Sequence, residues 1–520
     1  MKNKLLIIIF LLLFLIPAVY SLFLPGFFES DDGEWMVIRF SAFYQALSDG
    51  QFPVRFLGRL NFSYGYPVAN FLYPGFMYLA TPLQIFGLGF VNSIKLILIV
   101  SMLGGGLFSY FWLSKIFDKW SSFLGAIVFT YTPYHLYDLY KRGSVGEILA
   151  ISLLPFILWQ FERRSIFLTT IGIFLLILAH NTLAILFLFF VVFYMGLNIY
   201  VSKEKKDLIF DYLFSLLLGM GMASFFWIPA FLELRFTFFS NTQVSQWQNY
   251  FADINLIGVS TFVIFATILI LIFSKKIRIK EHRLTLLVLF VGTISIFLAS
   301  PISSIVWKIL PVSLVQFPFR FLSLVVPSSA FLAACAVAAL NGKSKIALSV
   351  ILITAVFFSS IGFLTTVLRT NKSDSFYSTN EATTTVKDEY MPPWVKEKPI
   401  SRFDNKIELE NRGEINNSVY NSKRIYFEAI TDGEENVRVN TIYYPGWEAK
   451  INDSESNISF DNPKGVMEIH LPRGENKVEF KFSETPLRLF SDFLSIISFI
   501  LLIIWNRKNV LNNRLIRRIK

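Results

Sequence analysis

The sequence predicts a polytopic α-helical membrane protein that carries a small β-rich domain outside the membrane. Hydrophobic residues make up 54% of the 520 residues and charged residues only 16%, whereas soluble domains carry about 25% charged residues. Apolar runs rich in Leu, Ile and Phe recur along the chain, which contains 57 Phe. One long stretch near the C-terminus is polar instead. This composition excludes a soluble, disordered or nucleic-acid-binding protein as the main description.

The apolar runs predict the number of membrane crossings, since a spanning helix needs about 20 mostly apolar residues. The first run, Leu5–Leu24, is long and has a poor cleavage site at Ala18-Val19-Tyr20, so we expect a retained helix rather than a signal peptide. Further runs are centred near residues 103, 128, 153, 172, 191, 220, 264, 292, 330, 356 and 496. We therefore expect about twelve spanning helices, or thirteen if Phe71–Gly89 also crosses.

Basic loops predict the orientation, because Lys and Arg favour the cytoplasmic side. From residue 93 onward, alternating crossings place every basic loop on one side. This scheme agrees with a cytoplasmic N-terminus only if Phe71–Gly89 does not cross, and Pro74 and Pro82 disfavour a lipid-exposed helix there. We expect a plasma-membrane protein with both termini in the cytoplasm, whose net charge of +11 requires no nucleic-acid partner.

Three regions follow from this pattern. Residues 1–368 form the multi-pass domain, with a large first outer loop at 25–92, and residues 487–520 form the last helix and a basic cytoplasmic tail. In residues 369–486 the period-two alternation of Val478–Phe482 and turns such as Pro445-Gly446 predict β-strands. We expect an extracytoplasmic β-sandwich there, with a structural or substrate-guiding role favoured over catalysis.

Acidic residues begin the first outer loop, just before a predicted amphipathic surface helix at Trp35–Leu47. Ser30, Asp31 or Asp32 can act as its N-cap, worth about 1 kcal/mol. Alternatively, a carboxylate beside the bilayer and crowded by Glu34 has a raised pKa and can take a proton from a hydroxyl. Both interpretations can hold, since there are two Asp. Adjacent carboxylates rarely converge on one ion and further ligands are not evident, so a divalent metal is the weaker alternative, and no cofactor is predicted to be required.

Aromatic residues in the same loop are candidates for sugar binding. Tyr64, Tyr66 and Tyr73 carry ring faces that stack on a sugar and hydroxyls that hydrogen-bond to it. The alternative is a simple anchoring role at the membrane interface. Gly65-Tyr66-Pro67 favours binding, because a rigid turn holds the ring at a fixed point. His180, one of four His in the chain, is interpreted as a hydrogen-bonded loop residue rather than a metal ligand.

Cations on the same predicted face are candidates for phosphate binding. Arg55, Arg142 and Arg320 carry guanidinium groups, which bind phosphate through two parallel hydrogen bonds. A single Arg near a helix end is usually structural, but three on one face favour an anionic lipid head group as partner. Glu147 and Gln316 accompany Arg142 and Arg320 at two loop–helix junctions and complete the predicted substrate-binding set.

The order of these motifs resembles a known family. A cytoplasmic N-terminus, one helix, an acidic residue in a long first outer loop and about ten further helices resemble the GT-C superfamily of membrane glycosyltransferases. More narrowly, Ser30-Asp31-Asp32-Gly33, Gly65-Tyr66-Pro67, Arg142–Glu147 and Gln316–Arg320 resemble motifs of the bacterial membrane family called 6-pyruvoyl-tetrahydropterin synthase-related. Tyr443–Trp447 resembles a motif of the YfhO-like membrane proteins. The pterin name does not fit the chain, because a pterin synthase of that name needs a zinc site of three His.

The resemblance implies a fold and a reaction. A GT-C-like membrane domain would take a sugar from a polyprenyl-phosphate donor at the outer leaflet and pass it to a hydroxyl of a glycan, lipid or protein acceptor. Asp32 stands at the position of the family's catalytic Asp, and Asp31 replaces the family's preceding His. Arg55, Arg142 or Arg320 would neutralise the leaving phosphate.

Two other functions remain open from the sequence. One is a transporter or flippase of lipid or oligosaccharide, which repeat symmetry and charges near the membrane midplane would favour; neither is evident in the sequence. The other is a non-enzymatic cell-envelope assembly protein in which the β-domain is the working part.

Overall fold

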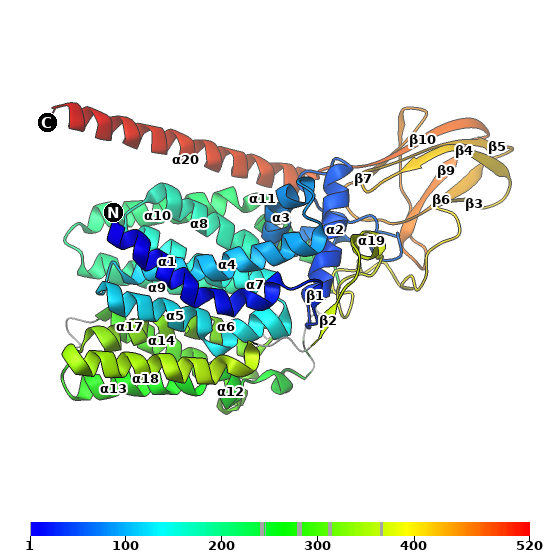
Figure 1. The fold of residues 1–520 in the computed structure, drawn as a ribbon. Helices are drawn as coiled ribbons and strands as arrows, with labels where there is room; N and C mark the ends of the chain where they lie inside the picture. Colours follow the sequence, from blue (N-terminus) through cyan, green and yellow to red (C-terminus); the bar gives the residue numbers. More distant parts are fainter. Residues whose placement is uncertain are drawn as a thin grey trace.

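The computed structural model describes residues 2–239, 244, 246–277, 283–309, 315–364 and 368–519. Its helices lie side by side in a bundle, and a β-rich domain projects from one end of it (Figure 1). The bundle helices are α1 (Lys2–Val19), α4 (Phe90–Leu113), α5 (Lys119–Tyr131), α7 (Val145–Glu162), α8 (Ile166–Ala179), α9 (Asn181–Val201), α10 (Lys205–Met222), α11 (Ser224–Leu232), α13 (Val259–Phe273), α14 (Arg283–Ala299), α17 (Leu322–Ala338), α18 (Gly342–Ser360) and α20 (Pro486–Ile519).

The multi-pass character is confirmed. Within the described ranges, seven helices are long and apolar enough to cross a membrane, or up to nine if each of two bent helix pairs counts as one span. A helix occupies each of the twelve predicted apolar runs, but α5, α8 and α13 have only 13, 14 and 15 residues. These lengths fall short of the roughly 20 residues of a full span. The predicted count of twelve is therefore higher than helix length supports.

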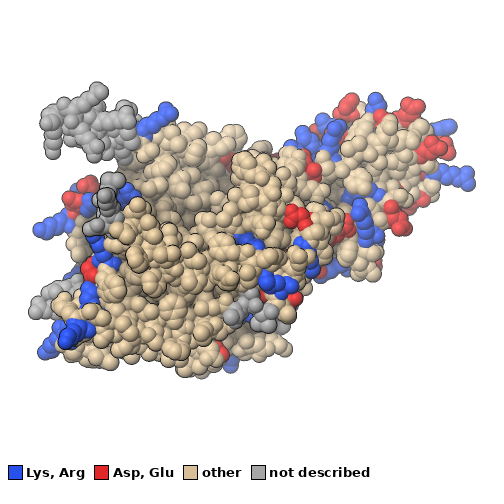
Figure 2. All heavy atoms as spheres, viewed as in Figure 1, with Lys and Arg blue, Asp and Glu red and all other residues tan. Residues whose placement is uncertain are grey.

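The basic loops lie together at the end of the bundle where α1 begins and α20 ends (Figure 1). Arg164 of the α7–α8 loop pairs with Glu204 of the α9–α10 loop. Lys345 Nζ, in the first turn of α18, pairs with Asp118 Oδ2, at the start of α5, at 2.8 Å. This ion pair joins the α17–α18 loop to the α4–α5 loop. Figure 2 shows Lys and Arg at this end, while the flank of the bundle is mostly uncharged. This is the one-sided arrangement that the sequence predicts; the side that faces the cytoplasm stays a prediction.

The first outer loop packs at the opposite end of the bundle. Helix α2 (Gly33–Ser48) runs across that end, and α3 (Gly75–Ile85) follows it (Figure 1). With 11 residues α3 is too short to span a membrane, in line with the expectation that Phe71–Gly89 does not cross.

Helix α2 is enclosed on both faces rather than lying on a membrane surface. Ile38, Ala42 and Phe43 are buried as its amphipathic pattern predicts, and Phe40 on the other face is buried too. Phe40 packs edge-on against Phe90 of α4, and the short helix α19 (Asp374–Thr379) contacts α2 where Ser41 Oγ donates to Tyr377 O at 2.6 Å. The predicted surface helix is thus a wall between the bundle and the β-domain.

The β-domain is a sandwich of two antiparallel sheets, as predicted. Buried Val478, Phe480 and Phe482 alternate with more exposed residues along one strand, so their side chains form the inner layer. One sheet has the order β4 (Gly413–Tyr420), β5 (Arg424–Thr431), β10 (Gly474–Phe482), β7 (Trp447–Ile451), β8 (Ser454–Ser456), and the other has β3 (Ile407–Leu409), β6 (Glu435–Ile442), β9 (Val466–Leu471).

A polar segment, residues 377–390, joins the β-domain to the end of the bundle; we call it the strap. Before it, β2 (Arg369–Thr370) pairs with β1 (Phe27–Phe28). The main chain of the strap then satisfies buried side chains of the first outer loop. Thr384 O accepts a hydrogen bond from Arg39 Nη2 at 2.7 Å, and Tyr390 N donates to Tyr66 Oη at 3.1 Å. Irregular backbone is tolerated here because its polar groups find partners.

The predicted orientation can be tested by cysteine labelling. Cys335 is buried, so single cysteines can be added to a Cys335→Ala background. Ile400→Cys on the β-domain side, where Ile400 is 88% exposed, should react with a membrane-impermeant maleimide in intact cells. Lys203→Cys, in the exposed loop at the other end of the bundle, should react only after permeabilisation. The reverse pattern would contradict the assigned orientation.

Candidate functional site

A cavity of about 760 Å³ lies between α2, the strap and the bundle. Five predicted site residues line it: Asp32, Tyr73, Arg142, Gln316 and Arg320. They come from four separate stretches of the chain, and the fold brings them together. The lining also includes Arg39 of α2, Ile185 of α9, Trp227 and Phe231 of α11, and Lys387 and Glu389 of the strap.

Asp32 stands at the entrance to α2, and its carboxylate is not spent on capping the helix. No side-chain cap bond is made by Asp32; Ser30 Oγ instead accepts from Gly33 N at 3.2 Å. The main-chain N–H of Asp32 donates to Arg142 O at 2.8 Å, and Arg142 Nη2 lies 3.2 Å from Asp32 Oδ2. The carboxylate is 38% exposed. It is therefore held in place yet open to the cavity.

One buried carboxylate holds the two cavity arginines. Glu147, in the first turn of α7, is 0% exposed, and its Oε1 accepts from Arg142 Nη1 and from Arg320 Nε, the latter at 2.9 Å. Tyr134 Oη donates to Oε2 of Glu147 at 3.2 Å. Arg320 also donates to Gln316 Oε1 at 2.6 Å. Glu147, predicted as a substrate-binding residue, does not line the cavity; it lies beneath the arginines because the two buried guanidiniums need a counter-charge.

A second buried acid, Asp138, lies beside Arg142. Asp138 is 0% exposed and accepts from Arg142 Nη1 at 3.0 Å through Oδ1. Burial and the nearby Glu147 carboxylate raise the pKa of Asp138 well above its usual value. Its Oδ2 has no hydrogen-bond partner in the part of the chain that the structure describes. Asp138 is therefore the weaker acid of the two buried carboxyl groups beside Arg142.

His180 lines the same cavity as a neutral imidazole. Burial lowers the pKa of His180 to about 3. Its Nδ1 accepts from Leu183 N at 3.2 Å, which caps α9, and Nε2 lies 3.6 Å from Glu147 Oε1. The ring centroid is 4.5 Å from that of Tyr73. The predicted hydrogen-bonded loop role is thus observed, and the residue also forms part of the cavity wall.

Arg39 is a cavity residue that the sequence analysis missed. It is 3% exposed, and its donors go to Thr384 Oγ1 at 3.2 Å, Thr384 O at 2.7 Å and Met36 Sδ at 3.4 Å. No carboxylate pairs with it among the described residues. Arg39 follows Asp32 by seven residues, so both lie on one face of α2. That spacing was a signal available in the sequence.

Two predicted site residues, Asp31 and Arg55, do not line the cavity. Asp31 is 54% exposed and lies 3.9 Å from Lys141 Nζ; burial raises its pKa, against the effect of Lys141. Arg55 is buried elsewhere, where its Nε and Nη2 pair with Glu484 and Asp492, each at 3.2 Å. The expectation that Arg55 joins the other two arginines is not met, because these carboxylates hold it against α20.

Two of the predicted tyrosines are also part of the packing rather than of the cavity. Tyr64 is 2% exposed and its ring packs edge-on against Phe403. Tyr66 is 0% exposed and its hydroxyl bonds Thr385 at 2.9 Å. The Gly65-Tyr66-Pro67 turn does hold a ring at a fixed point, but that ring anchors the strap.

The remaining wall of the cavity is apolar and reaches the flank of the bundle. Ile185 and Leu188 of α9 line it, opposite Trp227 and Phe231 of α11. Helix α11 is bent by 68° from α10. Ile185 is 46% and Phe231 66% exposed, so this wall continues into the exposed apolar surface of α9 and α11. The cavity therefore joins a charged end beneath the strap to an apolar end between α9 and α11.

Comparisons with known proteins identify the family. A family model described as "6-pyruvoyl-tetrahydropterin synthase related domain; membrane protein" matches residues 71–367, more than half of the chain. The chain belongs to this family, as its motifs indicated, and is a multi-pass membrane protein. No sequence match was found among curated proteins.

Solved structures resemble the chain only at a low level of identity. The arabinofuranosyltransferase AftD from mycobacteria is 14% identical, with a TM-score of 0.42, over 70% of this chain and 27% of its own. The oligosaccharyltransferase of Archaeoglobus fulgidus is 12% identical, with a TM-score of 0.45, over 74% of this chain and 56% of its own. The chain thus spans about a quarter of the length of AftD and just over half of the length of the oligosaccharyltransferase.

The two acids beneath the arginines should respond differently to neutralisation. Glu147→Gln removes the counter-charge of two buried guanidiniums and should destabilise the protein by about 3–5 kcal/mol. Asp138→Asn keeps an acceptor for Arg142 and, because the raised pKa of Asp138 favours its neutral form, should cost about 1 kcal/mol or less. Thermal unfolding of the purified variants measures both. Equal losses would contradict the assignment of the counter-charge to Glu147.

Proposed function

We propose that the protein is a membrane-embedded glycosyltransferase that moves a sugar from a polyprenyl-phosphate donor to an acceptor hydroxyl, with Asp32 as the general base. The observation that supports this most directly is that Asp32 and Arg39, seven residues apart on one face of α2, both line the cavity. A proton acceptor and a cation without a carboxylate partner among the described residues thus line the same cavity.

The charge of the cavity suits an anionic donor. Its lining contains four cations, Arg39, Arg142, Arg320 and Lys387, against two carboxylates, Asp32 and Glu389. Arg142 and Arg320 share Glu147, and Arg142 also contacts Asp32. Arg39 is the cation best placed to receive a phosphate, since its guanidinium bonds only neutral groups.

The apolar wall suits the lipid part of such a donor. A polyprenyl chain entering between α9 and α11 would contact Ile185, Leu188 and Phe231, while its phosphate reached the charged end. Burying the chain along this wall would gain roughly 25 cal/mol for each Å² of apolar surface. The lipid would therefore supply binding energy remote from the reacting bond.

The proposed reaction is a single displacement at the anomeric carbon. The acceptor O–H proton passes to an Asp32 carboxylate oxygen as the acceptor oxygen forms a bond to the anomeric carbon. The bond from that carbon to the phosphate oxygen breaks, and its electron pair leaves with the lipid phosphate. Arg39, with Arg142 and Arg320, stabilises the negative charge that develops on the leaving phosphate.

The strap supplies a further polar group on the acceptor side. Glu389 Oε2 is buried and has no hydrogen-bond partner in the described part of the chain, and the residue lines the cavity. We assign it to orienting the acceptor hydroxyl. Asp32 is preferred as the base because it begins a long helix and is held by both the main chain and the guanidinium of Arg142.

Neutralising Asp32 should stop transfer without unfolding the protein. Asp32→Asn keeps the hydrogen bond from Arg142 but removes the proton acceptor, so the rate should fall by about 10²–10⁴. The measurement follows label from a polyprenyl-phosphate-linked sugar that the wild-type protein uses. Asp31→Asn is the matched control, since the neighbouring carboxylate is exposed and outside the cavity; it should keep wild-type transfer. Full activity of Asp32→Asn with loss in Glu389→Gln would move the base to the strap.

Removing the charge of Arg39 should affect the leaving group. Arg39→Gln should lower kcat by about 10²–10³, the usual effect of removing one donor to developing charge. Arg39→Lys keeps the cation and should recover most of that loss. Donor analogues with better leaving groups should reduce the defect of Arg39→Gln, whereas an equal defect with every leaving group would refute this role.

A further inference from the structure

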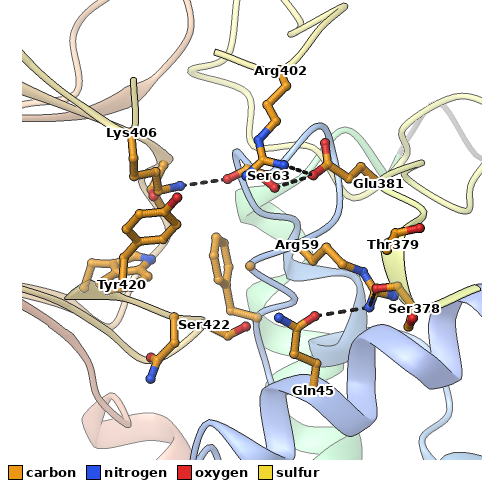
Figure 3. Close-up of a pocket in the computed structure, with 15 residues that line it drawn as sticks. Gln45, Arg59, Ser63, Ser378, Thr379, Glu381, Arg402, Lys406, Tyr420 and Ser422 are labelled. Atoms are coloured by element: carbon orange, nitrogen blue, oxygen red, sulfur yellow. Dashed lines mark hydrogen bonds and ion pairs between the residues drawn. The ribbon is translucent and has the colours of Figure 1, made fainter. Parts of the chain in front are cut away.

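A second pocket, of about 290 Å³, lies on the β-domain side of the strap. Its walls come from the end of α2, residues 56–63, strap residues 378–381 and the β-domain (Figure 3). No residue of the bundle helices α4–α18 lines it. The lining residues are Gln45, Phe56, Gly58, Arg59, Ser63, Ser378, Thr379, Glu381, Arg402, Lys406, Tyr420, Asn421, Ser422, Thr441 and Trp447. The proposed transfer reaction uses none of them.

Three cations and one carboxylate line this pocket. Arg59 binds the strap by donating to Asn380 O at 3.1 Å and to Ser378 O. It also donates to Gln45 Oε1 of α2 at 3.1 Å. Arg402 Nη1 donates to Glu381 Oε1 at 3.1 Å across the pocket, and its side chain is 55% exposed. The pocket lining therefore carries an excess of positive charge from Arg59, Arg402 and Lys406, whose side chains are labelled in Figure 3.

Lys406 contributes an ammonium group that is not fully used. Its Nζ donates to Ser63 O at 2.7 Å and to Asn440 O at 2.8 Å, which leaves one of three N–H donors. No carboxylate pairs with it among the described residues. Burial and the nearby Arg402 lower the pKa of Lys406 to about 7, against the opposing effect of Glu381. An anion in the pocket would stabilise the protonated form.

The pocket also carries the polar and aromatic groups that suit a sugar ring. Trp447 and Thr441 are 4% and 3% exposed, and Trp447 Nε1 and Thr441 Oγ1 have no hydrogen-bond partner in the described ranges. Unpaired buried donors and acceptors are costly, so a ligand with hydroxyls would gain from meeting them. The ring of Tyr420, which is 45% exposed, supplies an apolar face.

We propose that this pocket binds an acidic saccharide, with the sugar carboxylate between Arg402 and Lys406 and the ring against Tyr420. An aromatic face and unpaired polar groups favour a sugar over a bare phosphate ion. Since none of the lining comes from α4–α18, a soluble or chain-end saccharide fits better than a lipid head group. The site does not depend on the proposed transferase activity, because binding is measured without turnover.

Binding can be measured on the full-length protein in nanodiscs by ligand-observed NMR titration. Glucuronic acid is the probe, with glucose as the uncharged match and inorganic phosphate as the bare anion. Glucuronic acid should bind saturably and at least tenfold more tightly than either. Arg402→Gln, on the exposed side of the pocket, should weaken this binding at least fivefold. Arg438→Gln removes an equal charge from the same domain, outside the pocket, and should change nothing.

The pH dependence provides a second readout. Lys406 faces Arg402, Glu381 and the ring of Tyr420, and its pKa, lowered to about 7 by burial, means that its charge is lost as the pH rises through that value. The affinity for glucuronic acid should therefore fall between pH 6 and pH 8.5, and Lys406→Gln should abolish this fall. The proposal would be overturned if glucuronic acid did not bind saturably, or if glucose or phosphate bound equally well. Equal weakening of glucuronic acid binding by Arg438→Gln would also overturn it.

Discussion

The structure depends on a buried carboxylate, Glu147, that neutralises two guanidinium groups at the end of a helix bundle. Taking two arginines out of water is costly unless their charge is matched and their donors are used. Glu147 meets both needs, because its oxygens accept from Arg142, Arg320 and Tyr134. The arginines then tie together the segments before α7, before α17 and at the start of α2. A charged cavity can persist at the edge of a membrane because this counter-charge lies below it.

The strap has a comparable role at the junction between the bundle and the β-domain. Its carbonyls accept from Arg39 on one side and Arg59 on the other. It thus forms a wall of both pockets and positions α2 between the bundle and the β-domain. A segment without regular secondary structure can do this because buried arginines satisfy its main chain. The β-domain therefore acts as a support for the strap as well as a domain of its own.

Much of this arrangement was predictable because it rests on local chemistry. Apolar runs located the helices, charge alternation placed the basic loops together, and period-two patterns indicated the β-sandwich. The motifs around Asp32, Arg142 and Arg320 identified three residues of one cavity, since each motif sits where a loop enters a helix. Helix length was less predictable: α5, α8 and α13 are shorter than their apolar runs suggest. Arg55 was misassigned because its partners, Glu484 and Asp492, are over 400 residues away.

The central claim is that a lipid phosphate binds at the charged end of the cavity with its chain between α9 and α11. A photoreactive polyprenyl phosphate, cross-linked to the protein in nanodiscs and mapped by mass spectrometry, tests it most directly. The account predicts labelling of cavity residues such as Ile185 and Phe231, removed by unlabelled polyprenyl phosphate and weakened by Arg39→Gln. Labelling confined to the far side of the bundle, on α13 and α18, and unchanged by competitor would contradict it.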